Sequence, residues 1–215
     1  MRSYTTVDKM REIVIITRGL LTPMDTGPDE HLSTGAGDSP RADTSGYPNT
    51  IEDLSTGASI TFLERGVDEQ GAYLLMDGVL PVGINSGPAR LHPQAEARSE
   101  VIAGQADVTV RGERRVLRPG ESLTIAAGEA HSIRNGGDDT LRIRTTLRPP
   151  GEFEVATRAL YAVGAGGRPD VLAVAAVLFQ FREDIRLSGL PWLVQRPLLR
   201  ALAGIARRLG RDPLK

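Results

Sequence analysis

Two stretches of this chain, GESLTIAAGEAHSIRN at residues 120–135 and RLHPQAEARSEVIAG at residues 90–104, carry its clearest structural pattern. Both contain short runs in which apolar and polar residues alternate, and both include glycines that mark turns. A period of two is typical of a β-strand with one buried face. One histidine lies in each stretch, His131 in the first and His92 in the second. The two stretches therefore predict short strands with a histidine close to each.

Strand-like runs of the same kind continue from Ile51 to about Leu147. Turn residues such as Asp77-Gly78 and Pro119-Gly120 separate them. Many short strands with frequent turn signals indicate an antiparallel sandwich or jelly roll rather than a parallel sheet. We predict strands at residues 58–63, 72–76, 79–82, 100–102, 107–110, 115–117, 122–125, 131–133 and 141–147.

The regions on either side of these runs have different compositions. Residues 22–50 are dense in Gly, Pro, Ser, Thr and Asp and cannot bury enough apolar surface to offset the entropy of ordering. After residue 151 the apolar residues recur at helical spacing, which predicts helices at 153–163, 170–181 and 191–209. We therefore expect a flexible N-terminal extension (1–50), with a swapped arm as the alternative, a β-barrel (51–148) and a C-terminal helical extension (149–215).

Composition excludes several classes of protein. The chain has 215 residues, a formal net charge of −1 and no cysteine, so neither a phosphate backbone as partner nor a thiolate metal site is expected. Its longest apolar run falls far short of the roughly 20 residues that cross a bilayer. No secretory signal is recognisable, and we expect a cytoplasmic protein without nucleic-acid partners or membrane spans.

The last predicted helix has an apolar side and an arginine side. Leu198, Leu202 and Ile205 recur at steps of three and four residues, whereas Arg200 and Arg207 fall elsewhere. Such a helix fits either a membrane-surface element or a helix packed on the barrel or on another subunit. We favour the packed helix.

The two stretches together resemble the motifs of the cupin superfamily. Gly120, Gly128, His131 and Asn135 fall at every spacing of the second family motif, with Ala126 in place of its proline. The resemblance covers about residues 58–147. It implies a mainly β fold, a jelly-roll (double-stranded β-helix) barrel, here with a C-terminal α-helical extension. Homodimers are frequent in the family, which makes a homodimer the expected assembly.

The first family motif is altered here in a way that bears on cofactors. It supplies two histidines and a carboxylate which, with the histidine of motif two, bind a divalent metal. In this chain Arg90 occupies the first histidine position and Ala97 the carboxylate position, so only His92 and His131 remain. Glu96 is one residue out of register, and a one-residue shift turns a strand side chain to the opposite face. We therefore expect no cofactor; if a metal is bound, His92, His131 and Glu96 are its ligands.

Arg90, His92 and His131 are the predicted catalytic residues. Arg90 is expected to hold an anionic oxygen of a ligand, a histidine to act as general acid or base, and Glu96 and Asn135 to be further ligand-binding candidates. The first hypothesis is a metal-independent enzyme that cyclises, isomerises or dehydrates a carbonyl-containing metabolite, such as a polyketide-type intermediate. One alternative is a non-catalytic ligand-binding cupin in which the histidines only form hydrogen bonds. The other is a metal-dependent, dioxygenase-like cupin that uses His92 and His131.

Overall fold

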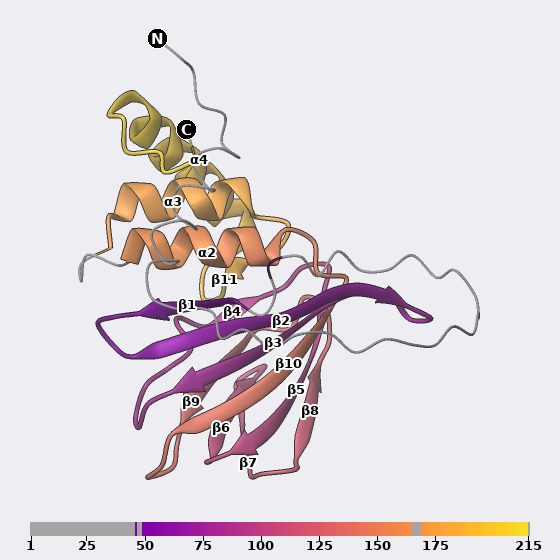
Figure 1. Ribbon diagram of the computed structural model, residues 1–215. Helices are drawn as coiled ribbons and strands as arrows, with labels where there is room; N and C mark the ends of the chain where they lie inside the picture. Colours follow the sequence, from indigo (N-terminus) through magenta and orange to yellow (C-terminus); the bar gives the residue numbers. More distant parts are fainter. Residues whose placement is uncertain (1–45, 47–48, 165–168, 215) are drawn as a thin grey trace, which may run out of the picture. The chain divides into compact units, whose positions relative to one another are not determined.

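Two antiparallel sheets and three helices make up the described part of the computed structural model, which comprises residues 46, 49–164 and 169–214 (Figure 1). The first sheet has the strand order β1-β2-β3-β10-β5-β8 and the second has the order β11-β4-β9-β6-β7. All of these elements lie within one compact unit, residues 40–213. The predicted mainly β fold with a C-terminal α-helical extension is confirmed.

The strands of the first sheet are β1 (Asn49–Asp53), β2 (Ala58–Asp68), β3 (Gly71–Leu80), β5 (Glu96–Ala103), β8 (Ser122–Ile125) and β10 (Leu141–Arg148). Those of the second sheet are β4 (Arg90–Leu91), β6 (Ala106–Val110), β7 (Glu113–Leu117), β9 (His131–Asn135) and β11 (Arg186–Leu187). The helices are α2 (Phe153–Gly164), α3 (Val171–Gln180) and α4 (Trp192–Arg208).

The predicted strands are found, with three kinds of difference. The run 79–82 is not a strand of its own, because β3 continues through Asp77-Gly78 to Leu80 while it pairs with β2 and β10. Three strands, β1, β4 and β11, are new, and the two short ones exist because they pair with each other. The predicted N-terminal extension lies outside the described residues up to position 48, apart from Gly46, and β1 begins at Asn49 within its expected range.

The space between the sheets is filled by large apolar side chains. Phe62, Leu74, Val101, Leu141 and Leu147 are almost completely buried. In β5 and β10 buried and outward-facing residues alternate, as the period of two requires. Burial of each such side chain contributes about 2 kcal/mol, so this core supplies most of the favourable free energy of the barrel.

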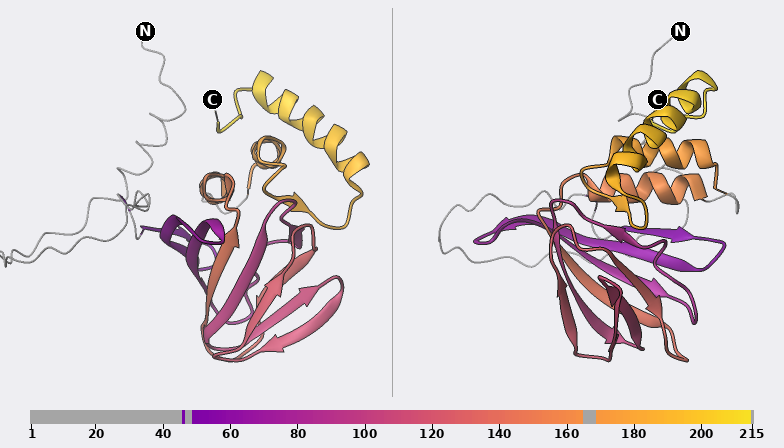
Figure 2. Two further views of the ribbon diagram at one scale, coloured as in Figure 1. Left: turned by 90° about the vertical axis from the view of Figure 1, so that its right-hand side faces the viewer. Right: turned by 180° about the vertical axis from the view of Figure 1, so that it is seen from behind.

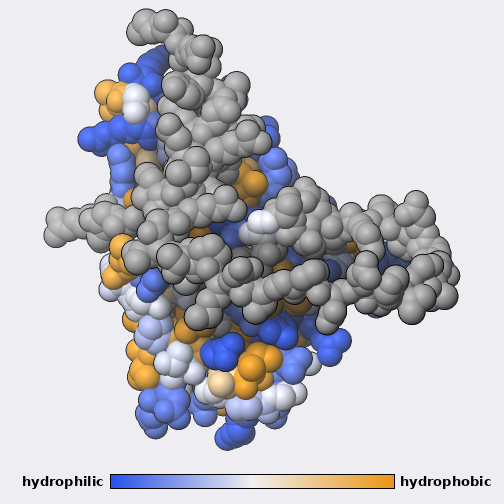
Figure 3. All heavy atoms as spheres, viewed as in Figure 1, coloured by the Kyte–Doolittle hydropathy of each residue, from blue (hydrophilic) through white to orange (hydrophobic). Residues whose placement is uncertain are grey.

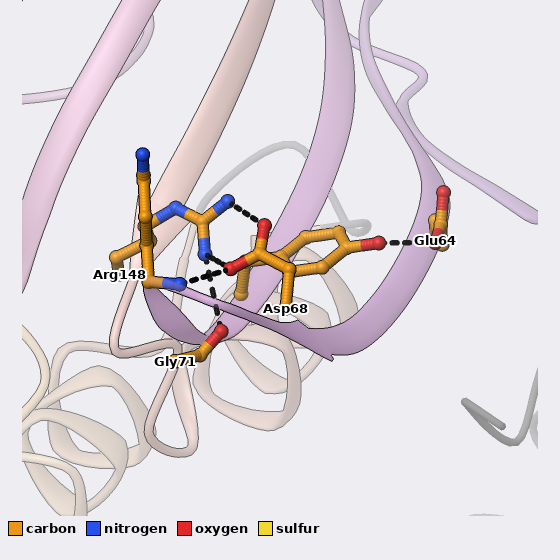
Figure 4. Close-up of polar contacts among 6 residues, drawn as sticks. Glu64, Asp68, Gly71 and Arg148 are labelled. Atoms are coloured by element: carbon orange, nitrogen blue, oxygen red, sulfur yellow. Dashed lines mark hydrogen bonds and ion pairs between the residues drawn. The ribbon is translucent and has the colours of Figure 1, made fainter. Parts of the chain in front are cut away.

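Arg148, at the end of β10, ties that strand to the β2–β3 hairpin (Figure 4). Its Nη1 and Nη2 atoms donate to the two carboxylate oxygens of Asp68 at 2.8 and 2.6 Å, and Nη1 also donates to the carbonyl of Gly71 at 3.1 Å. The guanidinium lies 4.7 Å from the centre of the Tyr73 ring, whose hydroxyl donates to Glu64. This bidentate pair fixes the hairpin turn against the strand that leads into the helices.

The helical extension packs through small side chains (Figure 2). Helix α3 begins at Asp170, whose carboxylate accepts hydrogen bonds from the backbone N–H groups of Leu172 and Ala173. Helix α4 crosses α3, and Ala203 and Ala206 are buried there against Ala176. The three predicted helices are confirmed to within one residue at each end. No helix in the described part of the chain is long and apolar enough to span a bilayer.

Candidate active site

Arg90, His92 and His131 are brought together where the short strand β4 lies between β9 and β11. Arg90 is the register partner of His131 in β9, and on its other side it pairs with Leu187 in β11. Side chains directly opposite each other in an antiparallel pair share one face of the sheet. His92 follows β4 directly and lies two residues from Arg90, so it returns to the face of Arg90.

His92 is held by the C-terminal extension rather than by the barrel alone. Its side chain is only 5% exposed. Nδ1 lies 2.9 Å from the carbonyl oxygen of Asp184, in the segment between α3 and β11. Because a carbonyl can only accept, Nδ1 carries the proton and Nε2 keeps its lone pair. The ring also meets the edge of Phe153, the first residue of α2, with ring centres 5.1 Å apart.

His131 has the same protonation pattern. It is 4% exposed, and its Nδ1 lies 3.0 Å from the carbonyl oxygen of Glu129, so this nitrogen too is the donor. The centres of the two imidazole rings are 5.1 Å apart, with the ring planes inclined at 45°. Within the described residues neither Nε2 atom has a hydrogen-bond partner. Two neighbouring imidazoles therefore each retain one unpaired lone pair.

Both histidines are neutral at physiological pH. Burial lowers the pKa of His92 to about 3, and the nearby charge of Arg90 acts in the same direction, against the hydrogen bond to Asp184. Burial, again with Arg90, also lowers the pKa of His131. An uncharged ring accepts a proton through its lone pair, so both residues are bases rather than acids in the free protein.

Arg90 supplies the positive charge of this cluster. Its Nη1 donates to the carbonyl of Ser86 at 2.8 Å, which positions the half-buried side chain. Burial lowers the pKa of Arg90, yet a guanidinium stays protonated in proteins. Among the described residues no carboxylate forms an ion pair with it, and its remaining N–H groups have no acceptor. Arg90 is therefore a cation with donors to spare for an anionic oxygen.

Glu96 does not join this cluster. It opens β5 as an exposed residue, whereas Ala97 and Ser99, on the opposite face of the strand, are buried. The family carboxylate position is thus the buried one, and alanine occupies it. As a candidate ligand-binding or metal-binding residue Glu96 is wrong, because the alternation of the strand directs it to solvent.

Asn135 is also wrong as a ligand-binding residue, although it is fully buried. Its Nδ2 donates to the carbonyls of Leu80 and Asp139, both at 2.8 Å, and its Oδ1 accepts from the N–H of Gly137 at 3.0 Å. These bonds join the end of β3 to the turn after β9. Asn135 is occupied in holding the fold together.

Residues 77–147 match the family model for the Cupin domain. The matched segment contains both histidine-bearing stretches in the expected order and nine-residue or shorter strands of both sheets. The chain belongs to the cupin superfamily. Gly128 shows how the motifs of this cupin cooperate: its N–H donates to the carbonyl of His92 at 2.7 Å, which links motif two to motif one.

Several solved structures are similar to this cupin. They include an RmlC-like cupin from Shewanella frigidimarina, with 20% identity over 59% of this chain and 96% of that chain and a TM-score of 0.42. KdgF from a Halomonas species has 18% identity over 45% of this chain and 84% of its own, with a TM-score of 0.39. The cupin domain of Schizosaccharomyces pombe Cnp3 has 17% identity over 46% of this chain and 66% of its own, with a TM-score of 0.38.

The coverage of other matched proteins is lower. A structure from Acidithiobacillus ferrooxidans shares 24% identity, and the match spans only about half of that protein, 49% of its length, and 35% of this chain, with a TM-score of 0.33. A search of the curated proteins found no match.

The residues present are a poor fit for the metal ion that the cupin fold implies. Two Nε2 lone pairs are available, but Ala97 replaces the carboxylate and Arg90 replaces another histidine. In the described ranges no group of three or more His, Asp, Glu or Cys side chains is placed to hold a metal. Two imidazoles beside a guanidinium form a weak chelate with an unfavourable charge.

Three residues of the helical extension complete the site without any signal in the sequence. Phe153 packs on His92, and the carbonyl of Asp184 sets its tautomer. Tyr161 in α2, for which the sequence predicts a packing role, lies within electrostatic reach of Arg90, whose charge opposes the rise that burial causes in the pKa of the phenol. A backbone carbonyl has no side-chain identity, so only the tertiary structure could reveal the role of residue 184.

Proposed function

We propose that this cupin is a small-molecule enzyme that performs acid–base chemistry on a carbonyl-containing substrate without a metal ion. The observation that supports it best is the pair of neutral imidazoles, each with Nδ1 bonded to a backbone carbonyl and Nε2 unpaired, beside the half-buried cation of Arg90. Cyclisation, isomerisation and dehydration all begin with the proton transfer that such a group performs.

The proposed first step removes a proton from the carbon next to the carbonyl. Nε2 of one histidine takes the proton, the electron pair of the C–H bond forms an enolate, and the developing oxyanion is bound by Arg90. The hydrogen bond from Nδ1 to a carbonyl stabilises the imidazolium that results. Return of the proton to a different atom gives an isomer, whereas attack of the enolate on a second carbonyl followed by loss of water gives a cyclised product.

Substrate charge is part of the proposal. A histidine with a pKa of about 3 is a weak base in the free protein. An anionic ligand beside the rings favours the imidazolium and raises its pKa, while Arg90 anchors the same ligand. We therefore expect substrates that have a carboxylate, phosphate or acidic enol close to the reacting carbonyl.

A non-catalytic ligand-binding domain is the second candidate. Near-complete burial of His92 and His131, each bonded to a backbone carbonyl, is what structural histidines also show. In that case Arg90 anchors an anionic ligand and no bond of the ligand is broken.

The two candidates are separated by proton exchange. Protein treated with a chelator is incubated in D₂O with acetoacetate, pyruvate and dihydroxyacetone phosphate, and deuterium uptake beside each carbonyl is followed by NMR. We expect accelerated exchange for at least one compound, and a loss of roughly a hundredfold or more in His92→Gln or His131→Gln. Glu96→Gln, on the outer face, is the matched control and is expected to keep the wild-type rate. Binding of these compounds without exchange overturns the enzyme proposal, as does exchange that survives both histidine substitutions.

Metal dependence is measured on the same samples. Elemental analysis after expression with added iron, nickel, manganese and zinc is expected to show no stoichiometric metal. A bound metal that is lost in both His92→Gln and His131→Gln, together with exchange that requires it, contradicts the metal-independent chemistry.

A further inference from the structure

Helix α4 has an apolar face that its own fold does not cover. Its packing on α3 uses Leu199, Ala203 and Ala206, which are buried. Four other apolar residues, at steps of four, seven and four along the same helix, form an exposed row that we call the outer stripe: Val194, Leu198, Ile205 and Leu209. They are between 45% and 61% exposed, and Leu193 beside them is 88% exposed.

The same helix is strongly basic. Between Trp192 and Arg208 it has four arginines and no acidic residue. Arg207 pairs with Asp212, but Arg196, Arg200 and Arg208 have no ion pair within the described residues. Figure 3 shows hydrophobic and strongly hydrophilic residues side by side where Figure 1 places α4.

A hollow on α4 combines the two properties. It is lined by apolar and small residues together with two of the unpaired arginines: Pro197, Arg200, Ala201, Gly204, Ile205 and Arg208. An apolar floor with a guanidinium on either side matches a phosphate headgroup whose acyl chains continue over the outer stripe. Arginine suits this role because it binds phosphate oxygens in a bidentate manner while its stem lies along apolar surface.

We propose that the outer face of α4 binds the surface of a membrane that contains anionic phospholipids. An amphipathic helix with exposed apolar residues and a basic polar edge lies in the interface between headgroups and acyl chains, and anionic lipid strengthens its binding. Charge argues against a second copy of this chain as the occupant, because α4 packed on α4 would bring two sets of arginines together without a carboxylate on either helix. A homodimer through another surface is unaffected.

Vesicle co-sedimentation of the full chain tests the proposal. Vesicles of phosphatidylcholine alone are compared with vesicles of equal parts phosphatidylcholine and phosphatidylglycerol. We expect binding to the anionic vesicles at least about tenfold tighter than to the neutral ones, and weaker binding at higher salt. Equal or absent sedimentation with the two vesicle types overturns the proposal.

Two pairs of substitutions locate the binding face. Arg200→Gln with Arg208→Gln is expected to weaken binding by about fivefold for each arginine removed. Leu198→Ser with Ile205→Ser is expected to weaken it by at least about tenfold. Val67→Ser with Val116→Ser, which changes two exposed apolar residues of the barrel, is the matched control and should bind as the wild type does. Binding that survives both α4 pairs contradicts the assignment of the face.

Fold and assembly are checked on the same variants. The fluorescence of Trp192, the single tryptophan of the chain, and the thermal unfolding midpoint should not change, because all four α4 positions are exposed. Analytical ultracentrifugation identifies the competing occupant. A dimer that dissociates on Leu198→Ser with Ile205→Ser, in a protein that does not bind vesicles, replaces the membrane with a second copy.

Discussion

Strand β9 begins at His131 and ends at Asn135, and its two ends treat a buried polar side chain in opposite ways. Both residues are nearly inaccessible, at 4% and 1% exposed. Asn135 uses its amide nitrogen twice and its oxygen once in bonds to the backbone, whereas His131 uses Nδ1 and leaves Nε2 unpaired. A side chain with every polar atom bonded holds a fold together, and one with an unpaired lone pair retains a group for chemistry.

The turns beside the two ends differ in the same way. Gly104, close to Asn135, has φ +78°, and a Cβ there would lie 2.8 Å from the carbonyl oxygen of Thr140. Gly112, close to the His131 end, has φ +86°, but a Cβ there would meet nothing within 4 Å. The Asn135 end is closely packed, and the His131 end has open space at its turn.

The largest effect is expected from Asn135→Ala. It leaves two carbonyls and one N–H without their partner, and each such group costs about 1–3 kcal/mol, so we expect a loss of about 4 kcal/mol in the free energy of unfolding. Urea denaturation measures it. A loss below about 1 kcal/mol would show that the Asn135 end does not depend on these bonds.

Gly104→Ala compared with Gly112→Ala isolates packing from backbone strain. Both substitutions put alanine at a positive φ, which costs about 1 kcal/mol, but only Gly104→Ala also forces a contact with backbone. We expect a loss of about 3 kcal/mol for Gly104→Ala and about 1 kcal/mol for Gly112→Ala in thermal or urea unfolding. Equal losses would contradict the difference between the two turns.

The next effect depends on pH. The pKa of His92 is lowered from 6.5 to about 3 in the folded protein, so below pH 6.5 the unfolded chain binds a proton that the folded chain does not. The stability that His92 contributes is therefore complete above pH 6.5 and falls as the pH drops toward 3, by at most about 1.4 kcal/mol per pH unit.

His92→Asn is the variant that tests this dependence, since asparagine does not titrate and its amide can still donate toward Asp184. Unfolding free energies of wild type and variant are compared between pH 7 and 4. We expect the wild type to have the steeper decline with falling pH. Parallel curves would mean that His92 is not held neutral.

The smallest effect is expected at an exposed ion pair beside His131. Glu129 accepts from Arg111 at 2.8 Å, and the Arg111 side chain is mostly exposed. We expect Glu129→Gln to reduce the free energy of unfolding by less than about 1 kcal/mol, because solvent screens such pairs. A larger loss in urea denaturation would place Glu129 in the structural framework of the site.

Local pattern was sufficient for the regular elements of this cupin. Alternation predicted the long strands, and helical spacing predicted α2, α3 and α4, because each of these properties depends on neighbours in the chain. Strand alternation also explains Glu96: a shift of one residue from Ala97 is enough to direct it outward. Strands β4 and β11 could not be predicted, because two residues form a strand only when distant partners bind them.

The sequence by itself determined the fold class, the order of the two cupin motifs and the replacement of two metal-binding positions by Arg90 and Ala97. These follow from residue identity and spacing alone. Only the tertiary structure assigned Asn135 to the fold, placed Phe153 and Asp184 on His92, and left both Nε2 atoms unpaired. The physical reason is that burial and hydrogen bonding depend on which segments, up to 92 residues apart for His92 and Asp184, come into contact when the chain folds.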